Sequence, residues 1–493
     1  MRKILFFLSS LLLAALLIIG CSNQKRNHIY IISTNDIHSS IDAFPRLATL
    51  VAEYETKGDV LLVDAGDRVS GNAYVDDATE PGIPIIDLMN IIGYDAATLG
   101  NHEFDKGHTA IDRAIEVANF PIVCANVKGI NGATTPLSYT TIERHGIDIG
   151  FVGVVDTDSE GALPLGNKSS YVDYEISSDI DTAYATCSEI APECDFIVLL
   201  SHMGLDVDEQ LAERNPACRW IVSGHSHNLV NKEHNGVHIS QNNKNIRYVT
   251  VADITLLHSA IESICYDQIS LSDIVPDASM EEHVAKIKLR DPELNSVVGI
   301  TTEAVDRQGV INFTIESLAT YPYDNGFIPE VVFYHVGGIR IDTLPKGEVK
   351  RVEILNNDPF VSYIVLAEMT PEQMRRFILD KYNSGTAEKA DKESHYIYFA
   401  SNIPYTIILG QEPTEAPNAT EVIMELEEGR SYRVAMCNYI TNNYIDLSTL
   451  ATPVVDTGVT VREAMLRHIG SFNEEGYTPD PTIRQFEVKG QNL

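Results

Sequence analysis

Metal-ligand residue types follow five of the short apolar runs in the first half of the sequence. Because loops at the carboxyl ends of strands line one crevice in open α/β sheets, we expect these side chains to converge. Mixed imidazole, carboxylate and amide ligation suits borderline first-row metal ions. The sequence therefore predicts a metal centre assembled from separate loops. Its motifs are Asp-x-His at 36–38, Gly-Asp at 66–67, Gly-Asn-His-Glu at 100–103, the histidine at 202 and Gly-His-x-His at 224–227.

Each of these motifs also has a plain structural interpretation. An Asp-x-His triplet commonly forms a surface turn, and a lone buried histidine is usually a core residue. The Gly-Asp and Gly-Asn pairs suit turns, because Gly and Asn tolerate positive φ. Only their shared placement after apolar runs favours the metal centre.

His102 and Asp105 are three residues apart. This spacing lets a carboxylate reach one imidazole nitrogen if the turn is helical. A histidine that caps a helix is the alternative.

Short apolar runs alternate with helical patterns from residue 28 to about 265, which indicates an α/β layer fold. Many of the runs are apolar throughout, as sheets covered on both faces require. Helical spacing is expected at 43–54, 84–92 and 109–117. The expected strands are 28–33, 60–63, 96–99, 121–124, 147–155, 196–200 and 220–222.

The pattern changes after about residue 265. Residues 275–296 favour a charged connecting helix, and a second, smaller α/β unit follows. We expect a signal segment at 1–21, a first domain at 27–268, a linker at 269–298 and a C-terminal domain at 299–493.

The amino terminus has a charged start, an apolar stretch and Gly20-Cys21. This arrangement is typical of an export signal, and Cys21 after Ile18-Ile19-Gly20 resembles a bacterial lipobox. A lipid anchor on Cys21 is the expectation, and an ordinary cleaved signal is the alternative. We therefore expect the bacterial cell envelope as the location, facing the periplasm or the exterior.

The composition is strongly acidic, with 70 Asp and Glu against 36 Lys and Arg and a formal net charge of −34. This balance argues against a partner that is a nucleic-acid polymer. An anionic substrate must then meet local positive charge, from metals or a few arginines. The cysteines follow no zinc spacing, so we interpret them as core residues or occasional disulfides.

Together these motifs resemble the calcineurin-like metallophosphoesterases. Gly-Asn-His-Glu-Phe-Asp at 100–105 with Gly-Gly-Ile-Arg at 337–340 is similar to the 5'-nucleotidase and UDP-sugar hydrolase family. The resemblance implies a four-layer αββα domain, a helical linker and a C-terminal substrate domain. It also implies two divalent ions among Mn, Zn, Fe, Co and Mg. One ion would be held by Asp36, His38, Asp67 and His227, and the other by Asp67, Asn101, His202 and His225.

Two cations about 3.5 to 4 Å apart lower the pKa of a shared water and hold the phosphoryl oxygens. By resemblance, His102 would donate to the phosphoryl group in the transition state and Asp105 would orient its ring.

The resemblance also assigns substrate contacts in the second half. Arg340 would bind phosphate or a substrate carboxylate, and Phe360 and Tyr439 would sandwich a base. A surface arginine and a core aromatic pair are the alternatives. The chain departs from the family with Val361-Ser362 after Phe360, with the sequence at 442–446, and with an expected helix at 317–327 that contains no arginine.

We therefore expect an exported phosphohydrolase that removes the 5'-phosphate of nucleotides. No protein partner is indicated. The alternatives are a UDP-sugar pyrophosphatase or cyclic-nucleotide phosphodiesterase with the same metals, and a nucleotide-binding lipoprotein without catalysis.

Overall fold

The computed structural model describes residues 26–157, 163, 164, 166, 168–257, 259–383, 397–410 and 419–489. The chain forms two compact units. Unit 1 takes the chain up to Ser70 and again Thr79–Ile287, and unit 2 takes Gly71–Ala78 and the chain from Lys288 onward. The expected signal segment and Cys21 lie outside the described residues. Across the described ranges, no helix is both long enough and apolar enough to cross a bilayer.

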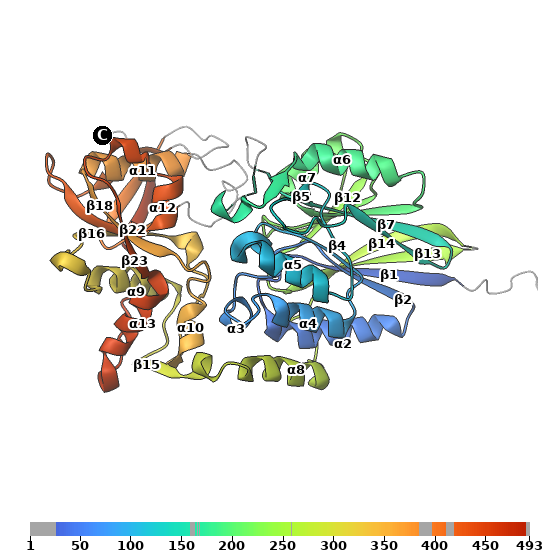
Figure 1. Cartoon of the computed structure of the whole chain (residues 1–493), viewed down its shortest axis with the longest axis horizontal. Coiled ribbons are helices and arrows are strands. Elements are labelled where there is room, and N and C mark those ends of the chain that lie inside the picture. Colours follow the sequence, from blue (N-terminus) through green and yellow to red (C-terminus); the bar gives the residue numbers. More distant parts are fainter. Residues whose placement is uncertain are drawn as a thin grey trace, which may run out of the picture. The chain divides into compact units, whose positions relative to one another are not determined.

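Unit 1 contains two six-stranded sheets (Figure 1). Strands β1 to β4 run parallel in the first sheet, and β7, β9, β10 and β12 run parallel in the second. The first sheet has the order β14 (Ala260–Ser270), β13 (Tyr248–Leu257), β1 (Asn27–Thr34), β2 (Asp59–Asp64), β3 (Ala96–Thr98), β4 (Ile122–Val123). The second has the order β11 (Leu229–His234), β12 (Val237–Asn242), β10 (Trp220–Ser223), β9 (Phe196–His202), β7 (Ile147–Val155), β6 (Tyr139–Arg144).

One apolar cluster joins the inner faces of the two sheets. It combines Ile31 and Val63 from the first sheet with Phe151, Val198 and Trp220 from the second, all of them buried. Because these side chains alternate along their strands, the opposite faces are left for helices. Figure 1 shows α2 (Phe44–Glu55) and α4 (Ile83–Ile92) on one outer side and α6 (Asp179–Ile190) and α7 (Leu205–Glu213) on the other. The predicted four-layer αββα arrangement is confirmed.

The strands that were expected from apolar runs form within two residues of their predicted bounds, and β7 has the predicted bounds. Gly66, with a φ of 90°, lies in the turn that follows β2. Helix α5 (His108–Val117) likewise matches its prediction. The carboxyl ends of β1, β2, β3, β9 and β10 therefore carry the motif residues.

Unit 2 is built on a mixed five-stranded sheet. Helices α9 (Arg307–Thr320) and α13 (Val461–Ser471) pack together beside it, and a three-stranded sheet adjoins α11 (Pro371–Asn383). The five-stranded order is β19 (Phe399–Ser401), β16 (Val331–His335), β22 (Tyr432–Cys437), β18 (Tyr363–Met369), β23 (Val455–Thr460). The smaller sheet contains β21 (Ala419–Met424), β20 (Tyr405–Leu409) and β24 (Gln485–Lys489), and β15 (Val297–Thr301) pairs with β17 (Gly347–Lys350). In the expected connecting segment, α8 covers Ala278–Leu289.

The predicted helix at 317–327 is wrong, because α9 spans Arg307–Thr320. Asp306 caps its start by accepting a hydrogen bond from the backbone N–H of Gly309 at 2.8 Å. Its end is set by Pro322, which disfavours helical geometry at the preceding residue, and Tyr321 is extended with φ −63° and ψ 133°. The helix thus begins with an arginine, contrary to the prediction that it has none.

A short segment from the first half of the sequence belongs to unit 2. Within Gly71–Ala78 lies α3 (Ala73–Asp76), and the backbone N–H of Ala73 donates to Oδ1 of Asn356 at 2.7 Å. The Tyr74 hydroxyl donates to Oδ1 of Asn295 at 2.6 Å. Nothing in the composition of this segment predicts its packing partner.

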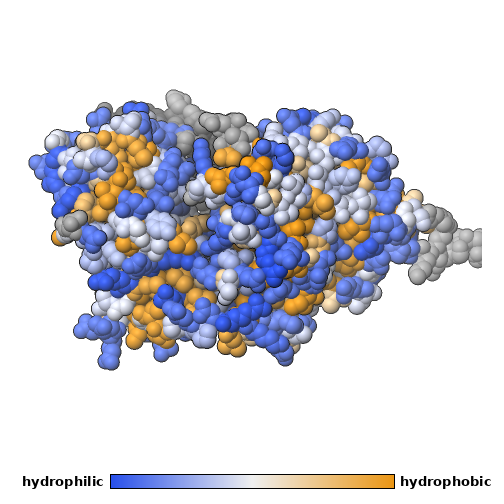
Figure 2. Space-filling view, viewed as in Figure 1, coloured by the Kyte–Doolittle hydropathy of each residue, from blue (hydrophilic) through white to orange (hydrophobic). Residues whose placement is uncertain are grey.

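The face shown in Figure 2 carries hydrophilic residues together with separate apolar patches. The described cysteines are all free thiols, so the disulfides that the sequence left open are not formed among them. They are Cys124, Cys187, Cys194, Cys218, Cys265 and Cys437.

Candidate metal centre

Two buried carboxylates, Asp36 and Asp67, lie at the centre of the motif residues in unit 1. Oδ1 of Asp36 lies 3.4 Å from Nε2 of His227 and 3.9 Å from Nε2 of His38. Oδ2 of Asp67 lies 3.1 Å from Nε2 of His202. Asp36 is fully buried, and Asp67 is 2% exposed. The loops after β1, β2, β9 and β10 therefore meet in one place.

The geometry forms groups that could each hold a cation. One group consists of Asp36, His38 and His227, and another consists of Asp36, Asp67 and His202. In each group the candidate ligand atoms lie within 4.8 Å of one another. The remaining two candidate ligands pair beside them, since Nδ1 of His225 lies 3.0 Å from Oδ1 of Asn101. All seven predicted ligands are thus brought together in unit 1.

Several imidazole nitrogens in this centre are placed where they could bind a cation. Nε2 of His38 faces Nε2 of His227 at 3.0 Å, so two lone pairs oppose each other unless a proton or a metal lies between the rings. The Nδ1 proton of His202 donates to the Ala65 carbonyl at 2.7 Å, which directs Nε2 toward Asp67. That buried Nε2 has no hydrogen-bond partner. The donor set therefore fits metal ligation, with the backbone carbonyl fixing the imidazole tautomer.

The backbone at the ligands is strained. Asp36, His38, Asp67, His225 and His227 all have positive φ, between 46° and 73°. Left-handed geometry at non-glycine residues costs on the order of 1–3 kcal/mol and clusters at functional sites. The tertiary structure imposes these conformations so that the side chains converge.

The electrostatics of the centre match its role as a cation site. Burial raises the pKa of Asp67, but His202 and His102 outweigh burial and hold this pKa well below its usual range. Burial lowers the pKa of His202, but Asp67 outweighs burial and raises this pKa well above its usual range. Ionised carboxylates thus persist without contact with water, and they bind positive charge strongly.

The candidate dyad forms in the short helix His102–Lys106. Nδ1 of His102 lies 2.8 Å from Oδ2 of Asp105, so the ring donates to the carboxylate. Nε2 of His102 points to the metal centre and lies 3.9 Å from Oδ2 of Asp67. The hydroxyl of Ser70 donates to the same Asp105 oxygen at 2.6 Å. Sequence reasoning missed Ser70, because no spacing relates it to Asp105.

Glu103 supports the loops that carry the ligands. Its carboxylate accepts from the backbone N–H of Asp67 at 3.0 Å, of Arg68 at 2.7 Å and of Gly100 at 2.5 Å. The buried Arg68 guanidinium lies 3.2 Å from Asp64 and 3.9 Å from Glu103. Glu103 therefore holds the Asp67 loop against the Asn101 loop without lying among the ligand groups.

The predicted substrate residues lie in unit 2. The Arg340 guanidinium lies over the Phe360 ring at 5.6 Å, so these two are brought together. Tyr439 packs on His335, with ring centroids 4.4 Å apart. Burial, with Arg340 as the smaller cause, lowers the pKa of His335 to about 3 and keeps its ring neutral. Their roles in binding a base stay a prediction.

Arg307, which the sequence analysis missed, shapes the Gly-Gly-Ile-Arg loop. Its guanidinium donates to the carbonyls of Ile339 at 2.8 Å and Ile341 at 2.7 Å, and to that of Val336 at 3.2 Å. These bonds fix the backbone immediately before and after Arg340. Val361, where the sequence departs from the family pattern, has a φ of 54°, which is costly for a β-branched residue.

Comparisons with known proteins agree with this geometry. The calcineurin-like phosphoesterase family matches residues 29–229, and the 5'-nucleotidase C-terminal domain family matches residues 298–451. The chain belongs to the 5'-nucleotidase-like metallophosphoesterases. It is therefore a member of a family of metal-dependent phosphoester hydrolases.

Individual relatives cover this metallophosphoesterase to different extents. The trifunctional nucleotide phosphoesterase YfkN of Bacillus subtilis is 26% identical over 83% of this chain and 31% of its own length. The 5'-nucleotidase of Bos taurus is 31% identical over 41% of this chain and 38% of its own. The chain spans about a third to a half of the length of the curated relatives it matches. The 5'-nucleotidase precursor of Thermus thermophilus shares the fold, with a TM-score of 0.76 at 18% identity over 94% of this chain and 99% of that chain.

Proposed function

We propose that this metallophosphoesterase binds two divalent metal ions and hydrolyses nucleotide phosphoesters, with removal of the 5'-phosphate as its main reaction. The observation that carries the proposal is the convergence of the seven candidate ligand side chains, Asp36 and Asp67 among them, with the His102–Asp105 pair beside them. The curated relatives named as 5'-nucleotidases support the same substrate class.

Residues of the chain have distinct tasks in this proposal. Bound metal ions would activate a water molecule and neutralise phosphoryl oxygens. His102 would present Nε2 to the phosphoryl group as charge develops there, because its Nδ1 is tied to Asp105. Ser70 and Glu103 orient Asp105 and the Asp67 loop. In unit 2, Arg340, Phe360 and Tyr439 would bind the rest of the nucleotide.

A broader specificity is the second candidate. YfkN is named a trifunctional nucleotide phosphoesterase, and it aligns with most of this chain. The fold alone does not determine which ester is hydrolysed. A sulfate thiohydrolase of Thermus thermophilus shares this fold, with a TM-score of 0.70 at 14% identity. Diesterase or pyrophosphatase activity on cyclic nucleotides or UDP-sugars would use the same centre.

Elemental analysis of the purified protein and phosphate release from AMP, UDP-glucose and 2',3'-cyclic AMP test both candidates. We expect about two metal ions per chain and release from AMP. Turnover of a diester without turnover of AMP would exclude the 5'-nucleotidase function. Nucleotide binding with no turnover of any ester would identify a binding protein.

Asp67→Ala tests the shared ligand. If Asp67 bridges two ions, this variant loses both metal content and activity, whereas Asp273→Asn, at an exposed site of unit 1, leaves both unchanged. A metal-replete, active Asp67→Ala variant would rule out the bridge.

We also propose that the chain is exported and tethered through a lipid on Cys21. The support is the sequence pattern at 1–21. Cys21→Ala should then move the protein from the membrane fraction to the soluble fraction of the producing cells. An unchanged distribution would refute the anchor.

A further inference from the structure

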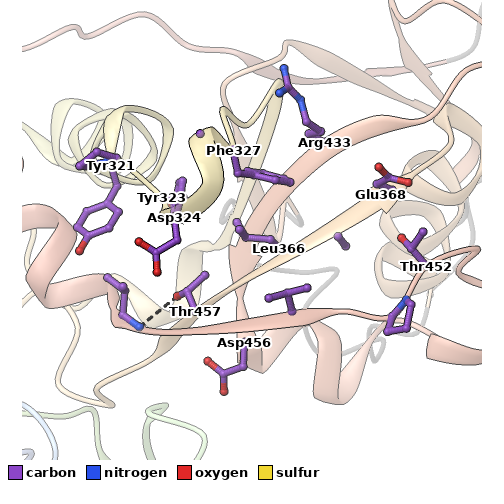
Figure 3. Close-up of a pocket in the computed structure, with 16 residues that line it drawn as sticks. Tyr321, Tyr323, Asp324, Phe327, Leu366, Glu368, Arg433, Thr452, Asp456 and Thr457 are labelled. Atoms are coloured by element: carbon purple, nitrogen blue, oxygen red, sulfur yellow. Dashed lines mark hydrogen bonds between the residues drawn. The ribbon is translucent and has the colours of Figure 1, made fainter.

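Unit 2 contains a cavity that the proposed hydrolysis does not use. It has a volume of about 740 Å³ and lies between the chain that follows α9 and strands β18, β22 and β23 (Figure 3). Small-molecule sites commonly have volumes of about 300–1,000 Å³. The cavity is therefore large enough for an organic ligand.

The cavity lies at the opposite end of the five-stranded sheet from the predicted base-binding residues. Glu368 and Arg433, which line it, pair across β18 and β22. Phe360 precedes the other end of β18, and Tyr439 follows the other end of β22. Arg433 and Tyr439 are six residues apart along this part of the chain, which at about 3.3 Å per strand residue corresponds to well over 10 Å. The two sites are thus separate.

Aromatic and aliphatic side chains form the body of the cavity. The ring of Tyr323 is 5.2 Å from that of Tyr321 and 6.2 Å from that of Phe327, between centroids. Figure 3 shows the Phe327 ring beside Leu366. Val455, also in the lining, is 57% exposed, which is a large exposure for an aliphatic side chain at a cavity. An apolar ligand group would remove this surface from water.

Charge at the cavity is predominantly negative. Asp324, Glu368 and Asp456 line it together with a single cation, Arg433. Nε of Arg433 lies 3.6 Å from Oε2 of Glu330, a carboxylate that also pairs with Arg430. Asp456 accepts a hydrogen bond from the backbone N–H of Gly458 at 2.9 Å, and Figure 3 shows its carboxylate pointing away from the rings. Among the described residues, Asp324 and Glu368 have no ion-pair partner within 4.0 Å.

The ring faces of the cavity already attract cations of this chain. The Arg433 guanidinium lies 5.9 Å from the centroid of Phe327, and the Arg467 guanidinium lies 5.9 Å from that of Tyr321. Aromatic faces bind cations with about 0.5–1 kcal/mol at exposed sites. Unpaired carboxylates beside such rings are complementary to a positive group on an apolar body.

We propose that this cavity binds an organic cation, namely an amine or guanidinium on an aromatic or aliphatic body. The apolar body lies against Phe327, Leu366 and Val455, and the positive group lies near Asp324 or Glu368. A nucleotide or another anion is disfavoured, because the three carboxylates in the lining outnumber its single arginine. The ligand can be a free amine or the basic side chain of a peptide, which present the same chemistry.

Three probes of similar shape test the charge preference by calorimetric titration of the full-length protein: phenethylamine, 2-phenylethanol and 3-phenylpropionate. We expect phenethylamine to bind about tenfold more tightly than the alcohol, and the propionate not to bind measurably. A capped Phe-Arg dipeptide amide compared with phenethylamine separates the peptide source from the free amine. Equal binding of the amine and the alcohol, or no binding of the amine, would overturn the proposal.

Variants of residues that line the cavity test whether phenethylamine binds there. Val455→Lys adds a positive charge at an exposed position and should abolish binding of phenethylamine, while the double variant Asp324→Asn, Glu368→Gln should weaken it about threefold to tenfold. Asp273→Asn, an exposed aspartate of unit 1, is the matched control and should bind normally. Unchanged affinity in Val455→Lys would show that the amine binds elsewhere. Phosphate release by these variants should match the wild type, so failure of this proposal is distinguishable from failure of the proposed hydrolysis.

Discussion

Glu103→Gln should uncouple the two loops that carry the central metal ligands. The Glu103 carboxylate is 8% exposed, and it accepts three backbone hydrogen bonds from Asp67, Arg68 and Gly100. Glutamine has almost the same shape but only one acceptor oxygen. Either one or two of the three backbone N–H groups would then face an amide NH₂ that cannot accept.

The magnitude follows from these contacts. An unsatisfied buried N–H costs about 1–3 kcal/mol, and each remaining bond loses the extra strength of a charged acceptor, about 1 kcal/mol. Arg68 keeps Asp64 at 3.2 Å, so its charge stays paired. We therefore expect a loss of about 3–5 kcal/mol in the free energy of unfolding, out of about 5–15 kcal/mol for a typical protein. Metal affinity should fall about 10-fold to 100-fold, as it does when groups that orient ligands are removed.

Urea unfolding and metal titration against a competing chelator measure the two effects separately. Glu282→Gln, which removes the charge of an exposed glutamate on α8, is the matched control. Because this control keeps both loops, it should bind metal normally. If Glu103→Gln unfolds and binds metal like the wild type, Glu103 does not hold the loops, and the reasoning from its three bonds is wrong.

Three further changes probe the centre and the fold. His102→Ala should lower the rate of phosphate release about 100-fold or more at unchanged metal content; loss of metal would instead make His102 a ligand. Val361→Gly should raise the free energy of unfolding by about 0.5–1 kcal/mol in urea, because relief of left-handed strain of about 1–2 kcal/mol exceeds the flexibility that glycine adds. Val455→Gly in the extended strand β23 is the control, and equal destabilisation of both variants would contradict the strain. Burial lowers the pKa of His238 to about 4, so the imidazole takes up a proton less readily in the folded state than in the unfolded state. The free energy of unfolding should therefore fall as pH decreases from about 6.5 towards 4. His238→Gln should remove about 1–2 kcal/mol of this decrease in the free energy of unfolding, after allowance for the partial exposure of the ring. Identical pH dependence of stability in the variant and the wild type would refute this prediction.

The sequence alone determined most of the elements around the metal centre. Apolar runs predicted β1, β2, β3, β9 and β10, because a parallel strand that is buried on both faces has a nearly continuous apolar sequence. The rule that strand carboxyl ends share one edge then predicted which side chains would meet.

Only the tertiary structure decided the contacts between residues that no spacing connects. Ser70 on Asp105, Glu103 on three backbone N–H groups and Arg307 on the Arg340 loop each depend on how strands and helices pack. The helix that was predicted at 317–327 failed for a different reason. Asp306 and Pro322 set the ends of the real helix, and both are local signals that the sequence itself carries.

The sequence determines which residues can be metal ligands, and the tertiary structure determines their geometry. Residue types and order specify which groups can hold a cation, because ligand chemistry is a property of the side chain. Their positive φ values, the facing nitrogens of His38 and His227 and the orphan nitrogen of His202 arise only when the packed sheets force the loops together. Left-handed geometry is uncommon even for Asp and His, and the energy of the surrounding fold maintains it at all five positions.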